Sequence, residues 1–571
     1  MIVLGFTFWS GSHDSSAAIV RDGALVAAAE EERFTRRKHD GGVPVNAIDF
    51  CLRAAGVEMR HVDAIAYPDM PFRTGPHSQI AEMRRETLAE MIRGGHARKR
   101  SMLHKRALDV AVRTGVARDA GINPMVEEAF RVLAQRYGVL PPVMYYAHHL
   151  SHAAAAYLTS GFDEAAVVTL DGRGGPLSGA TWHGRATALW RLEEEPYTNS
   201  LGWFYRDCTR YAGLGAFGEG KLMGLAPYGR ASQKVAAVTG MLDTAGGRWF
   251  RYRAPPSDED VGFPSRGEDD VLDDPWPDFA AATQHALERG YERAVRSAVG
   301  TSRARNLCVG GGVAMNCSAN GKLLASGVPD EMWIFPASGD AGLSVGAALL
   351  AARDGGELVS RRVESPYWGP EFDDAECEAA IGAVSGVSFR EPVDLSSEVA
   401  GALAEGKVVG WFQGRMELGP RALGNRSILA DPRTIAMRDK VNRVKGREPW
   451  RPLAPSVLAE HTREYFERVP PNAFMLFAVQ ATQTAREKTP AIVHVDGSAR
   501  PQPVTRDLNE RYYDLIAAFD RLTGVPVLLN TSFNAAGEPI VCTPADALRT
   551  FVATGLDLLV LGSLLVTKVG R

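Results

Sequence analysis

Ala165-Ala166-Val167-Val168-Thr169-Leu170-Asp171-Gly172 is the stretch that decides the fold of this 571-residue chain. Its apolar and β-branched residues predict a buried strand, and the Asp-Gly pair predicts a turn where that strand ends. The pattern continues into a second strand through Ala180-Thr181-Trp182. A similar strand–turn–strand unit opens the chain, where residues 2–8, 16–21 and 24–30 predict three short strands joined by tight turns at 11–14 and 21–23. The layout therefore occurs twice.

A glycine-rich turn follows a further predicted strand. Residues 306–309 run into Gly310-Gly311-Gly312, and a helix is predicted from Ala314 onward. Glycine lets backbone N–H groups approach a phosphate or an adenosine closely. Two strand–turn–strand units and a strand–glycine–helix turn predict a mixed α/β fold of the actin-like ATPase type.

Two histidines precede the deciding strand. His148 and His152 stand four residues apart at the head of an Ala-rich run, 153–157, that predicts a helix. Residues four apart share a helix face, so both imidazoles can reach one ion, and Asp171 adds a carboxylate. Such a set suits a catalytic transition metal, with Fe(II) among the candidates. A chance pair on a helix surface is the alternative at this point. His149 points about 100° away from His148 and is expected to be structural.

Composition limits the class of protein. A chain of this length predicts two or more domains, because single cores rarely grow beyond roughly 250–300 residues. The net charge of −4 argues against a nucleic-acid-binding or membrane-binding chain. Six scattered cysteines without a C-x-x-C pair fit a reducing compartment and no structural zinc. We therefore expect a soluble cytoplasmic protein.

A segment rich in glycine and proline predicts the domain boundary. A predicted helix at 342–354 is followed by a Gly- and Pro-rich stretch, which places one domain at 1–357 and a second at 366–571. Residues 70–140 read as an insertion of helices, with a basic segment from Arg93 to Arg106. These helices either cover a sheet edge or form a lid that shapes an acceptor pocket.

The second domain concentrates positive charge. Between Arg415 and Arg451 there are ten Lys and Arg against four Asp and Glu. Arg matches phosphate oxygens with two parallel hydrogen bonds, and Lys adds a point charge. Short polar side chains in Leu529–Asn534 can complete a cradle for an anion. In a chain that is acidic overall, this pattern predicts an anionic-substrate pocket. A nucleic-acid surface would need exposed aromatics within a broader basic stripe.

Taken together, the motifs closely resemble those of the O-carbamoyltransferase family over nearly the whole chain. That family includes nodulation protein U and the carbamoyltransferases that finish cephem, tobramycin, novobiocin and ansamycin antibiotics. The matching motifs are His13–Ala18, Glu30–Arg36, His148–His152, Gly220–Ala226, Gly419–Ser427, Trp450–Ser456 and Asn530–Pro539.

The resemblance implies an actin-like N-terminal domain, a YrdC-like C-terminal domain and a reaction in two steps. Carbamoyl phosphate and ATP would form carbamoyl-adenylate in the C-terminal domain. A hydroxyl of a natural-product acceptor, such as an antibiotic or a sugar, would then take the carbamoyl group in the N-terminal domain. The implied cofactors are ATP, Mg²⁺ and Fe(II) or another divalent transition metal. We expect no nucleic-acid partner, no membrane, and a monomer or homodimer.

The resemblance also assigns residues. The carbamoyl phosphate site would consist of Arg421, Arg426, Lys445, Arg451, Asn530 and Ser532. The contacts to ATP or carbamoyl-adenylate would come from Lys38, Lys221, Gly311, Gly312, Asn316 and Arg500. The metal ligands would be His148, His152, Asp171 and Asp340. The catalytic residues would be His13, Asp14, Lys445 and Arg451. His13 is the expected general base, because an imidazole titrates near working pH. The alternative for His13 is a turn-capping role.

Three other classes of protein are alternatives to an O-carbamoyltransferase. A fused tRNA threonylcarbamoyl-adenosine synthase shares both domain types and differs in its substrates, which are threonine, bicarbonate and tRNA. A hydrogenase-maturation carbamoyltransferase is disfavoured, because its acylphosphatase and C-x-x-C zinc modules are missing from the sequence. A non-catalytic nucleotide-dependent scaffold would not need the carbamoyl phosphate residues.

Overall fold

The computed structural model describes most of the chain, namely residues 1–8, 13–69, 124–231, 238, 240–243, 249–267, 273–359, 362–471 and 473–569. The chain forms two compact units, residues 1–68 with 142–571 and residues 69–141. Among its described residues the second unit carries helix α5, Pro124–Tyr137. The basic segment 93–106, interpreted as part of a lid, lies outside the described residues.

A five-stranded sheet opens the larger unit. Its order is β3 (Ala24–Glu30), β2 (Ser16–Arg21), β1 (Ile2–Thr7), β4 (Ala64–Tyr67) and β5 (Val143–Tyr145). The first three strands are antiparallel, and β4 and β5 run parallel to β1. At the β2–β3 turn, Asp22 and Gly23 both have positive φ, 50° and 75°, as a type I′ hairpin turn requires. The predicted Asp-Gly hairpin is confirmed.

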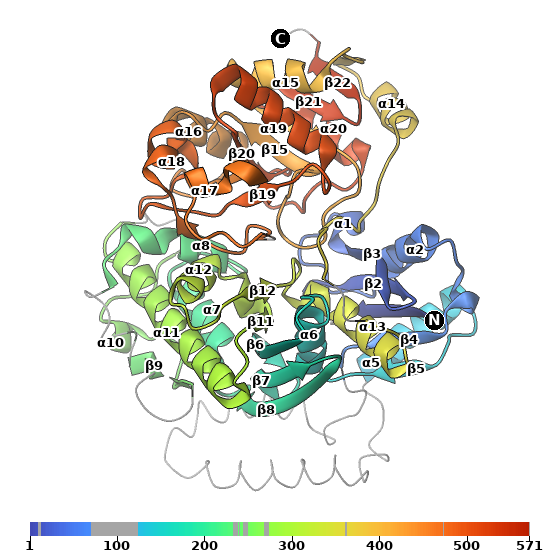
Figure 1. The fold of residues 1–571 in the computed structure, drawn as a ribbon, viewed down its shortest axis with the longest axis vertical. Helices are drawn as coiled ribbons and strands as arrows, with labels where there is room; N and C mark the ends of the chain where they lie inside the picture. The colour runs from blue at the N-terminus through green and yellow to red at the C-terminus, as the bar shows by residue number, and fades with distance from the viewer. Residues whose placement is uncertain are drawn as a thin grey trace, which may run out of the picture. The chain divides into compact units, whose positions relative to one another are not determined.

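The second sheet repeats the first. Its order is β8 (Ala188–Pro196), β7 (Leu177–Arg185), β6 (Glu164–Gly174), β11 (Leu307–Gly310) and β12 (Met332–Ile334). Again three strands are antiparallel and two follow in parallel (Figure 1). Long helix α11 (Trp276–Ser302) packs on β6 and β7. The duplicated order confirms the predicted α/β, actin-like layout.

The deciding strand runs further than the sequence predicts. Asp171 and Gly172 lie within β6 instead of following it, and the register to β7 shifts between Leu170 and Gly174. A bulge of this kind redirects side chains at the end of a strand. It leaves Asp171 at the edge of a site instead of in the regular ladder.

Two Ala-rich helices pack directly against each other. These are α6 (His148–Tyr157) and α13 (Leu343–Asp354), and α13 also packs on β1 and β2 (Figure 1). At Gly346 of α13 an added Cβ would lie 1.9 Å from the carbonyl oxygen of Ser151. Only glycine permits that approach, and it brings the N-terminal ends of the two helices together.

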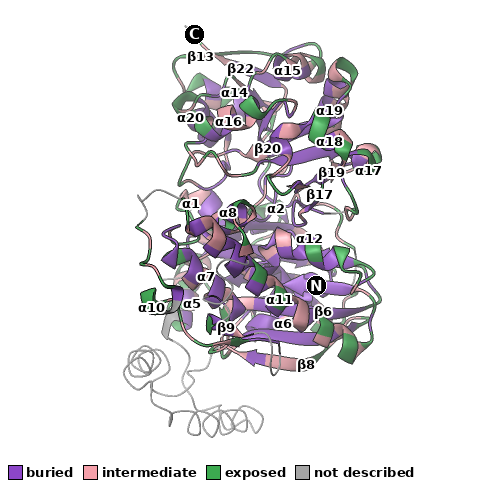
Figure 2. Ribbon diagram, turned by 90° about the vertical axis from the view of Figure 1, so that its left-hand side faces the viewer, coloured by how far each residue is buried: buried purple, intermediate pink, exposed green. Residues whose placement is uncertain are grey.

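The C-terminal part has its own mixed sheet of eight strands. The order is β13 (Val387–Arg390), β22 (Leu564–Lys568), β21 (Leu558–Leu561), β14 (Val409–Phe412), β15 (Arg426–Ala430), β20 (Val527–Ser532), β16 (Ala454–Leu458) and β19 (Gln502–Val504). Helices α15 (Leu395–Ala404) and α19 (Glu510–Thr523) pack on each other. Figure 2 shows that β20, like β6, is largely buried. Polar side chains on β20 therefore need partners or a ligand.

Short helix α1 (Glu32–Thr35) ties the first sheet to the C-terminal part. Arg33 donates from Nη2 to the carbonyl of Gly419 over 3.0 Å, and the Gly419 N–H donates to Oε1 of Glu30 over 2.8 Å. Arg36 donates to the carbonyl of Ile540 over 2.6 Å. Among the described helices, none has the length and apolar character needed to span a membrane.

Candidate functional site

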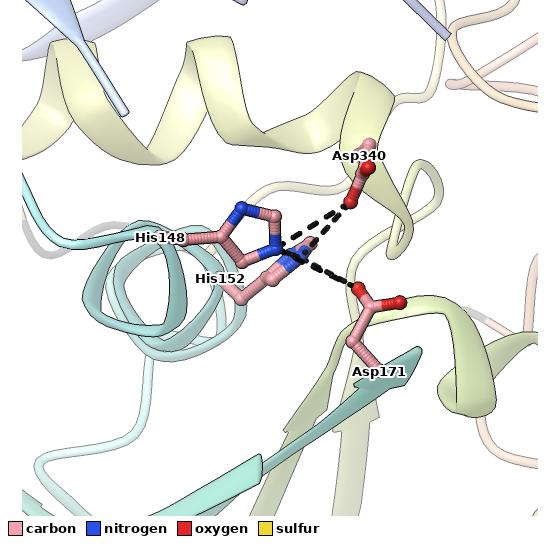
Figure 3. Close-up of side chains that lie close together, drawn as sticks. All are labelled: His148, His152, Asp171 and Asp340. Atoms are coloured by element: carbon pink, nitrogen blue, oxygen red, sulfur yellow. Dashed lines mark hydrogen bonds and ion pairs between the residues drawn. The ribbon is translucent and has the colours of Figure 1, made fainter. Parts of the chain in front are cut away.

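Four side chains converge where the two repeats of the N-terminal part meet. His148 and His152 come from successive turns of α6, Asp171 from the bulged end of β6, and Asp340 from the turn that precedes α13 (Figure 3). The two Nε2 atoms are 3.1 Å apart. Nε2 of His152 is 3.0 Å from Oδ2 of Asp171 and 3.4 Å from Oδ1 of Asp340. The predicted quartet is brought together.

The separations suit a shared cation. All four ligand atoms lie within 4.8 Å of one another. Imidazole nitrogen and carboxylate oxygen bind a transition metal at about 2.0–2.2 Å, which sets neighbouring ligands roughly 3–3.6 Å apart. Four of the five measured separations, 3.0–3.6 Å, fall in that range, and the fifth, from Nε2 of His148 to Oδ2 of Asp171, is slightly longer at 3.8 Å. Two imidazoles and two carboxylates are donors that suit Fe(II), Mn(II) or Zn(II).

Backbone groups hold the quartet in place. Asp171 accepts backbone hydrogen bonds from Gly172 at 2.6 Å and Gly312 at 3.2 Å. A Cβ on Gly174 would lie 2.1 Å from Cδ2 of His148, so this glycine makes room for the imidazole. The ligands are thus oriented by the bulge and by the glycine turn.

Two members of the quartet, His152 and Asp171, have shifted pKa values. Burial lowers the pKa of His152, but its hydrogen bonds to Asp171 and Asp340 outweigh burial and raise the pKa to about 9. Burial raises the pKa of Asp171, whereas the neighbouring imidazoles of His148 and His152 hold it well below its usual value. The two carboxylates supply the negative charge that a cation needs.

His149 has a structural place, as expected. Its Nδ1 lies 3.1 Å from Oγ1 of Thr169 on β6, and the ring is buried. Burial, followed by the charges of His148 and His152, lowers the pKa of His149 to about 3. This imidazole is therefore neutral at physiological pH.

His13 lies near the quartet and is paired. Its Nδ1 donates to Oδ2 of Asp14 over 3.0 Å. Burial lowers the pKa of His13, but Asp14, Asp340 and Asp171 outweigh burial and raise the pKa to about 9. The electrostatic effect of Asp340 and Asp171 places His13 within range of the quartet, with its side chain 37% exposed.

The glycine turn lies beside Asp171, as the contact from Gly312 shows. Gly311 has φ +90°, and an added Cβ would lie 2.2 Å from the carbonyl oxygen of Leu170. Asn316 caps helix α12 (Cys317–Ala325) by accepting from the Ala319 N–H over 3.0 Å, and it also pairs with Gln284. Its carboxamide is already in use, so a contact to ribose would have to share it.

A second cluster gathers cations from both parts of the larger unit. Lys445 follows α16 (Ile435–Val444), and its Nζ donates to the carbonyl and Oγ of Ser532 and, over 2.8 Å, to Oδ1 of Asn534. The cations that act on one another electrostatically here are Lys38, Arg421, Lys445, Arg447, Arg451 and Arg500.

This cation cluster is short of acids. Burial, followed by the charges of Arg447, Arg451 and Lys38, holds the pKa of Lys445 well below its usual value. Burial and then Arg500 lower the pKa of Arg421 to about 9. Glu448 pairs with Lys221 at 2.9 Å and with Arg451 at 3.6 Å. Mutual repulsion of this kind is relieved by a bound anion.

Three guanidinium nitrogens of this cluster also lack acceptors among the described residues. Within the described part of the chain, Nε of Arg421, Nε of Arg500 and Nη2 of Arg447 are buried without a hydrogen-bond partner. Buried donors are normally satisfied, and each unmet one costs about 1–3 kcal/mol. A phosphate offers the acceptors that these donors need.

Arg426 is not brought into this cluster. It is fully buried, donates to the carbonyls of Gln413, Asn425 and Pro370, and stacks over Phe412 at 3.6 Å. Its Nη1 and Nη2 are thus engaged by backbone carbonyls, whereas its buried Nε has no hydrogen-bond partner among the described residues.

Asn530 lies deeper on β20 than Ser532, on the same face two residues away. Its Nδ2 donates to Oγ of Ser456 over 3.0 Å and to the carbonyl of Ala422 over 3.3 Å. Among described residues its buried Oδ1 has no partner, so it is an acceptor open to a ligand.

Three further residues lie at or beside the candidate site residues and were not predicted from the sequence, namely Arg447, Asn534 and His39. Arg447 stands beside Lys445 in the basic run, and Asn534 closes the Asn-Thr-Ser-Phe-Asn motif. The sequence shows that both segments are polar, but it does not show which of their polar side chains lie near Lys445. His39 contacts Asp14, and nothing in the sequence predicts this contact, because His39 simply follows a basic run.

The duplicated α/β fold thus carries two candidate sites, the His/Asp quartet and a cation cluster that suits an anion. Two family models match the chain: carbamoyltransferase N-terminus over residues 3–349 and carbamoyltransferase C-terminus over residues 400–568. The chain belongs to the carbamoyltransferase family, and the resemblance read from its motifs is confirmed.

Curated relatives agree with this assignment. Nodulation protein NolNO of Sinorhizobium fredii is 39% identical, over 97% of this chain and 79% of that protein. Nodulation protein NolO of Bradyrhizobium diazoefficiens is 42% identical over 74% of this chain and 78% of its own length. Nodulation protein U of Sinorhizobium fredii is 30% identical over 94% of each chain.

Solved structures give more distant matches. A ROK family glucokinase from Streptomyces griseus covers 61% of this chain and 99% of its own, at 13% identity and a TM-score of 0.29. Full-length HypF covers 31% of this chain and 22% of its own, at 19% identity and a TM-score of 0.22.

Proposed function

We propose that the protein is an ATP-dependent O-carbamoyltransferase that works in two steps. In the first, carbamoyl phosphate, water and ATP give carbamoyl-adenylate, phosphate and pyrophosphate. In the second, an acceptor hydroxyl attacks the carbamoyl carbon, the bond to AMP breaks, and a carbamate ester forms. The observation that supports this most is the buried, acid-poor cation cluster around Lys445.

The cation cluster is suited to the first step. Lys445 and Ser532 would hold the phosphate of carbamoyl phosphate, with Arg421 and Arg451 supplying bidentate contacts. Arg500 and Lys38 would contact the nucleotide phosphates, with Lys221 beside them. Positive charge fixed in a buried site offsets the charge that develops as phosphate or pyrophosphate leaves. We propose the C-terminal part, 366–571, as the seat of this step.

Asn530 would recognise the carbamoyl end. Its free Oδ1 can accept an N–H from the carbamoyl NH₂, while Ser456 and Ala422 fix the orientation of its Nδ2. Ser456 is fully buried, and its Oγ donates to Gln502 over 2.8 Å. A closed, polar end of this kind favours an unsubstituted NH₂ over a bulky threonyl substituent, which supports a carbamoyl donor over a threonylcarbamoyl one.

The second step would take place at the quartet in the N-terminal part, 1–357. His148, His152, Asp171 and Asp340 would hold Fe(II) or another divalent transition metal. When bound, such an ion can offset negative charge on the adenylate phosphate. His13, oriented by Asp14, would accept the proton of the attacking hydroxyl, and Gly311, Gly312 and Asn316 would lie against the adenosine. Mg²⁺ would accompany ATP.

The proposed acceptor is a hydroxylated small molecule, such as an antibiotic or a sugar. We propose that the protein acts in the cytoplasm as a monomer or homodimer, without nucleic acid or membrane. The charge of −4 and the scattered cysteines support this proposal.

The test of the first step is carbamoyl-phosphate-dependent exchange of labelled pyrophosphate into ATP, with bicarbonate and threonine excluded. Exchange under these conditions supports the proposal. Exchange that requires threonine and bicarbonate instead would identify a threonylcarbamoyl-adenosine synthase. No exchange with either set would indicate a nucleotide-dependent scaffold, and the proposal would fail.

A further inference from the structure

The carboxylate of Asp14 is held between two histidines. Oδ2 accepts from Nδ1 of His13 over 3.0 Å, and Oδ1 accepts from Nδ1 of His39 over 2.9 Å. The two histidines are 26 residues apart in the sequence, and each uses the same ring nitrogen. Both oxygens of one carboxylate are thereby fixed, which leaves Asp14 no freedom to rotate away from His13.

His39 is itself held from several sides. Its backbone N–H donates to Oε2 of Glu32 over 2.6 Å. Its ring stacks on Phe217, with centroids 4.0 Å apart and planes at 21°, and the edge of the same phenyl ring meets His13 at 5.1 Å. The backbone of Ser15 donates to the carbonyl of Asp40 over 2.8 Å and closes the two segments onto each other.

The backbone at both ends of the His39–Asp14 bond is unusual. Asp14 has φ 64° and His39 has φ 57°, in the left-handed region that non-glycine residues rarely adopt. Such conformations persist where the surroundings enforce them, and they cluster at functional sites. Here they direct both side chains toward each other.

We infer that His39 is a positioning residue for carbamoyl transfer. It donates from Nδ1 to Asp14, and Asp14 in turn holds the Nδ1–H of His13. Because Asp14 holds the Nδ1–H, Nε2 of His13 is the nitrogen that can accept a proton once it is deprotonated, and this form becomes more abundant as pH rises toward the His13 pKa of about 9. His39 does not touch the substrate; it acts on the reaction through Asp14.

This inference rests on the proposed function. In the transfer step the hydroxyl O–H bond breaks and its proton passes to Nε2 of His13. The oxygen forms a bond to the carbamoyl carbon, and AMP leaves with the electron pair of the broken C–O bond. A carboxylate fixed at Nδ1 stabilises the imidazolium that results, as the buried Asp does in hydrolase triads.

The experiment compares His39→Asn with His39→Leu. The two side chains have nearly the same shape, and both lose the stack on Phe217. Asn can still donate to Asp14 from an NH₂ near the former Nδ1, whereas Leu cannot. His285→Leu, on an exposed residue of α11, is the control. The probe acceptor is glycerol, and the readouts are AMP formed from ATP and carbamoyl phosphate, KM for carbamoyl phosphate, and pyrophosphate exchange.

We expect His39→Leu to lower the rate of AMP formation by about tenfold or more, within the range of general-base effects, with exchange and KM unchanged. His39→Asn should stay within about threefold of the parent. Equal rates for the two variants, whether both are lowered or both are normal, would overturn the inference. Loss of exchange in the parent protein would instead contradict the proposed function.

A crystal structure of His39→Leu decides the point without any acceptor. The carboxylate of Asp14 is expected to turn, and its bond to Nδ1 of His13 should be lost. If Asp14 stays at hydrogen-bond distance from His13, His39 does not position it, and the inference is wrong even where AMP formation by the parent is too slow to measure.

Discussion

Lys445 shows how a single residue can mark an anion site. Its ammonium is buried beside other cations, and its hydrogen-bond partners, Ser532 and Asn534, are neutral. A charge left in such surroundings is costly, which is why its pKa falls. A phosphate would supply the missing opposite charge, and the relief of the repulsion among the cations would favour its binding.

Lys445→Ala should abolish adenylate formation. Removing a preorganised donor to a reacting phosphate typically lowers rates by about 10²–10³. The measurement is carbamoyl-phosphate-dependent pyrophosphate exchange. Lys440→Ala is the matched control, because Lys440 lies on α16, the helix that Lys445 follows, and pairs with Asp557 at the surface. Parental exchange in Lys445→Ala would remove this lysine from the first step.

His148→Ala should affect the other step. Exchange is expected within about twofold of the parent, whereas AMP formation with an acceptor and the metal content of the purified protein should fall, because one of four ligands is gone. Elemental analysis reports the metal, and His183→Ala, a partly exposed His paired with Glu164, is the control. If the variants of Lys445 and His148 both lost only the second step, the division between two sites would be untenable.

The sequence predicted residue types better than it predicted their partners. His148 and His152 could be found because a helix fixes their spacing, and Asp171 because it ends an apolar strand. Arg426 lies in the same motif as Arg421, yet it folds back onto carbonyls of its own loop. His39 was missed because its contact with Asp14 depends on two left-handed residues that no periodicity reveals.

At the scale of elements, the His/Asp quartet depends on the terminal residues of three elements. Helix α6 begins at His148, β6 bulges at Asp171, and Asp340 begins the turn that leads into α13. The Asp-Gly hairpin of the first sheet could be predicted, since its turn residues are local. The bulge and the contact of α6 with α13 could not, because both depend on residues far apart in the chain.

Gly174→Ala should disturb the quartet without touching a ligand. The new Cβ would lie 2.1 Å from Cδ2 of His148, so the imidazole must move. We expect a lower metal content and slower transfer, with exchange unchanged. Gly300→Ala is the control, since its position on α11 is open and Ala is favoured over Gly in a helix by about 0.5–1 kcal/mol. A parental metal content in Gly174→Ala would show that the ring can relax.

On the scale of the whole molecule, α1 joins the two proposed sites. Arg33 and Arg36 bind the carbonyls of Gly419, Ile540 and Pro539 in the C-terminal part. A few residues further on, Lys38 reaches the cation cluster and His39 holds Asp14. One short segment thus lies within electrostatic range of the cation cluster and also bonds Asp14. The resemblance implied two domains, but these contacts between them could be read only from the structure.

Binding of an anion to the cation cluster of the full-length protein should be accompanied by proton uptake. Burial and neighbouring cations lower the pKa of Lys445 in the free protein, and a bound anion raises it. Between those two pKa values the lysine is neutral when free and charged when bound, so binding must take up protons. Sulfate is the suitable probe, because it carries two negative charges and has no proton of its own to exchange near neutrality.

Isothermal titration with sulfate in two buffers of different ionisation enthalpy measures this uptake, at ionic strength matched with NaCl. As pH rises from below the lowered pKa of the free lysine toward the ordinary Lys value of about 10.4, uptake should grow from near zero, pass a maximum and fall again, because the lysine has the same charge in both states at either extreme. In Lys445→Ala the part of the uptake that comes from this lysine should vanish, while Arg421, Arg451 and Arg500 still bind sulfate more weakly. Binding with proton release, or uptake that is the same in the parent and in Lys445→Ala, would show that Lys445 does not face the anion.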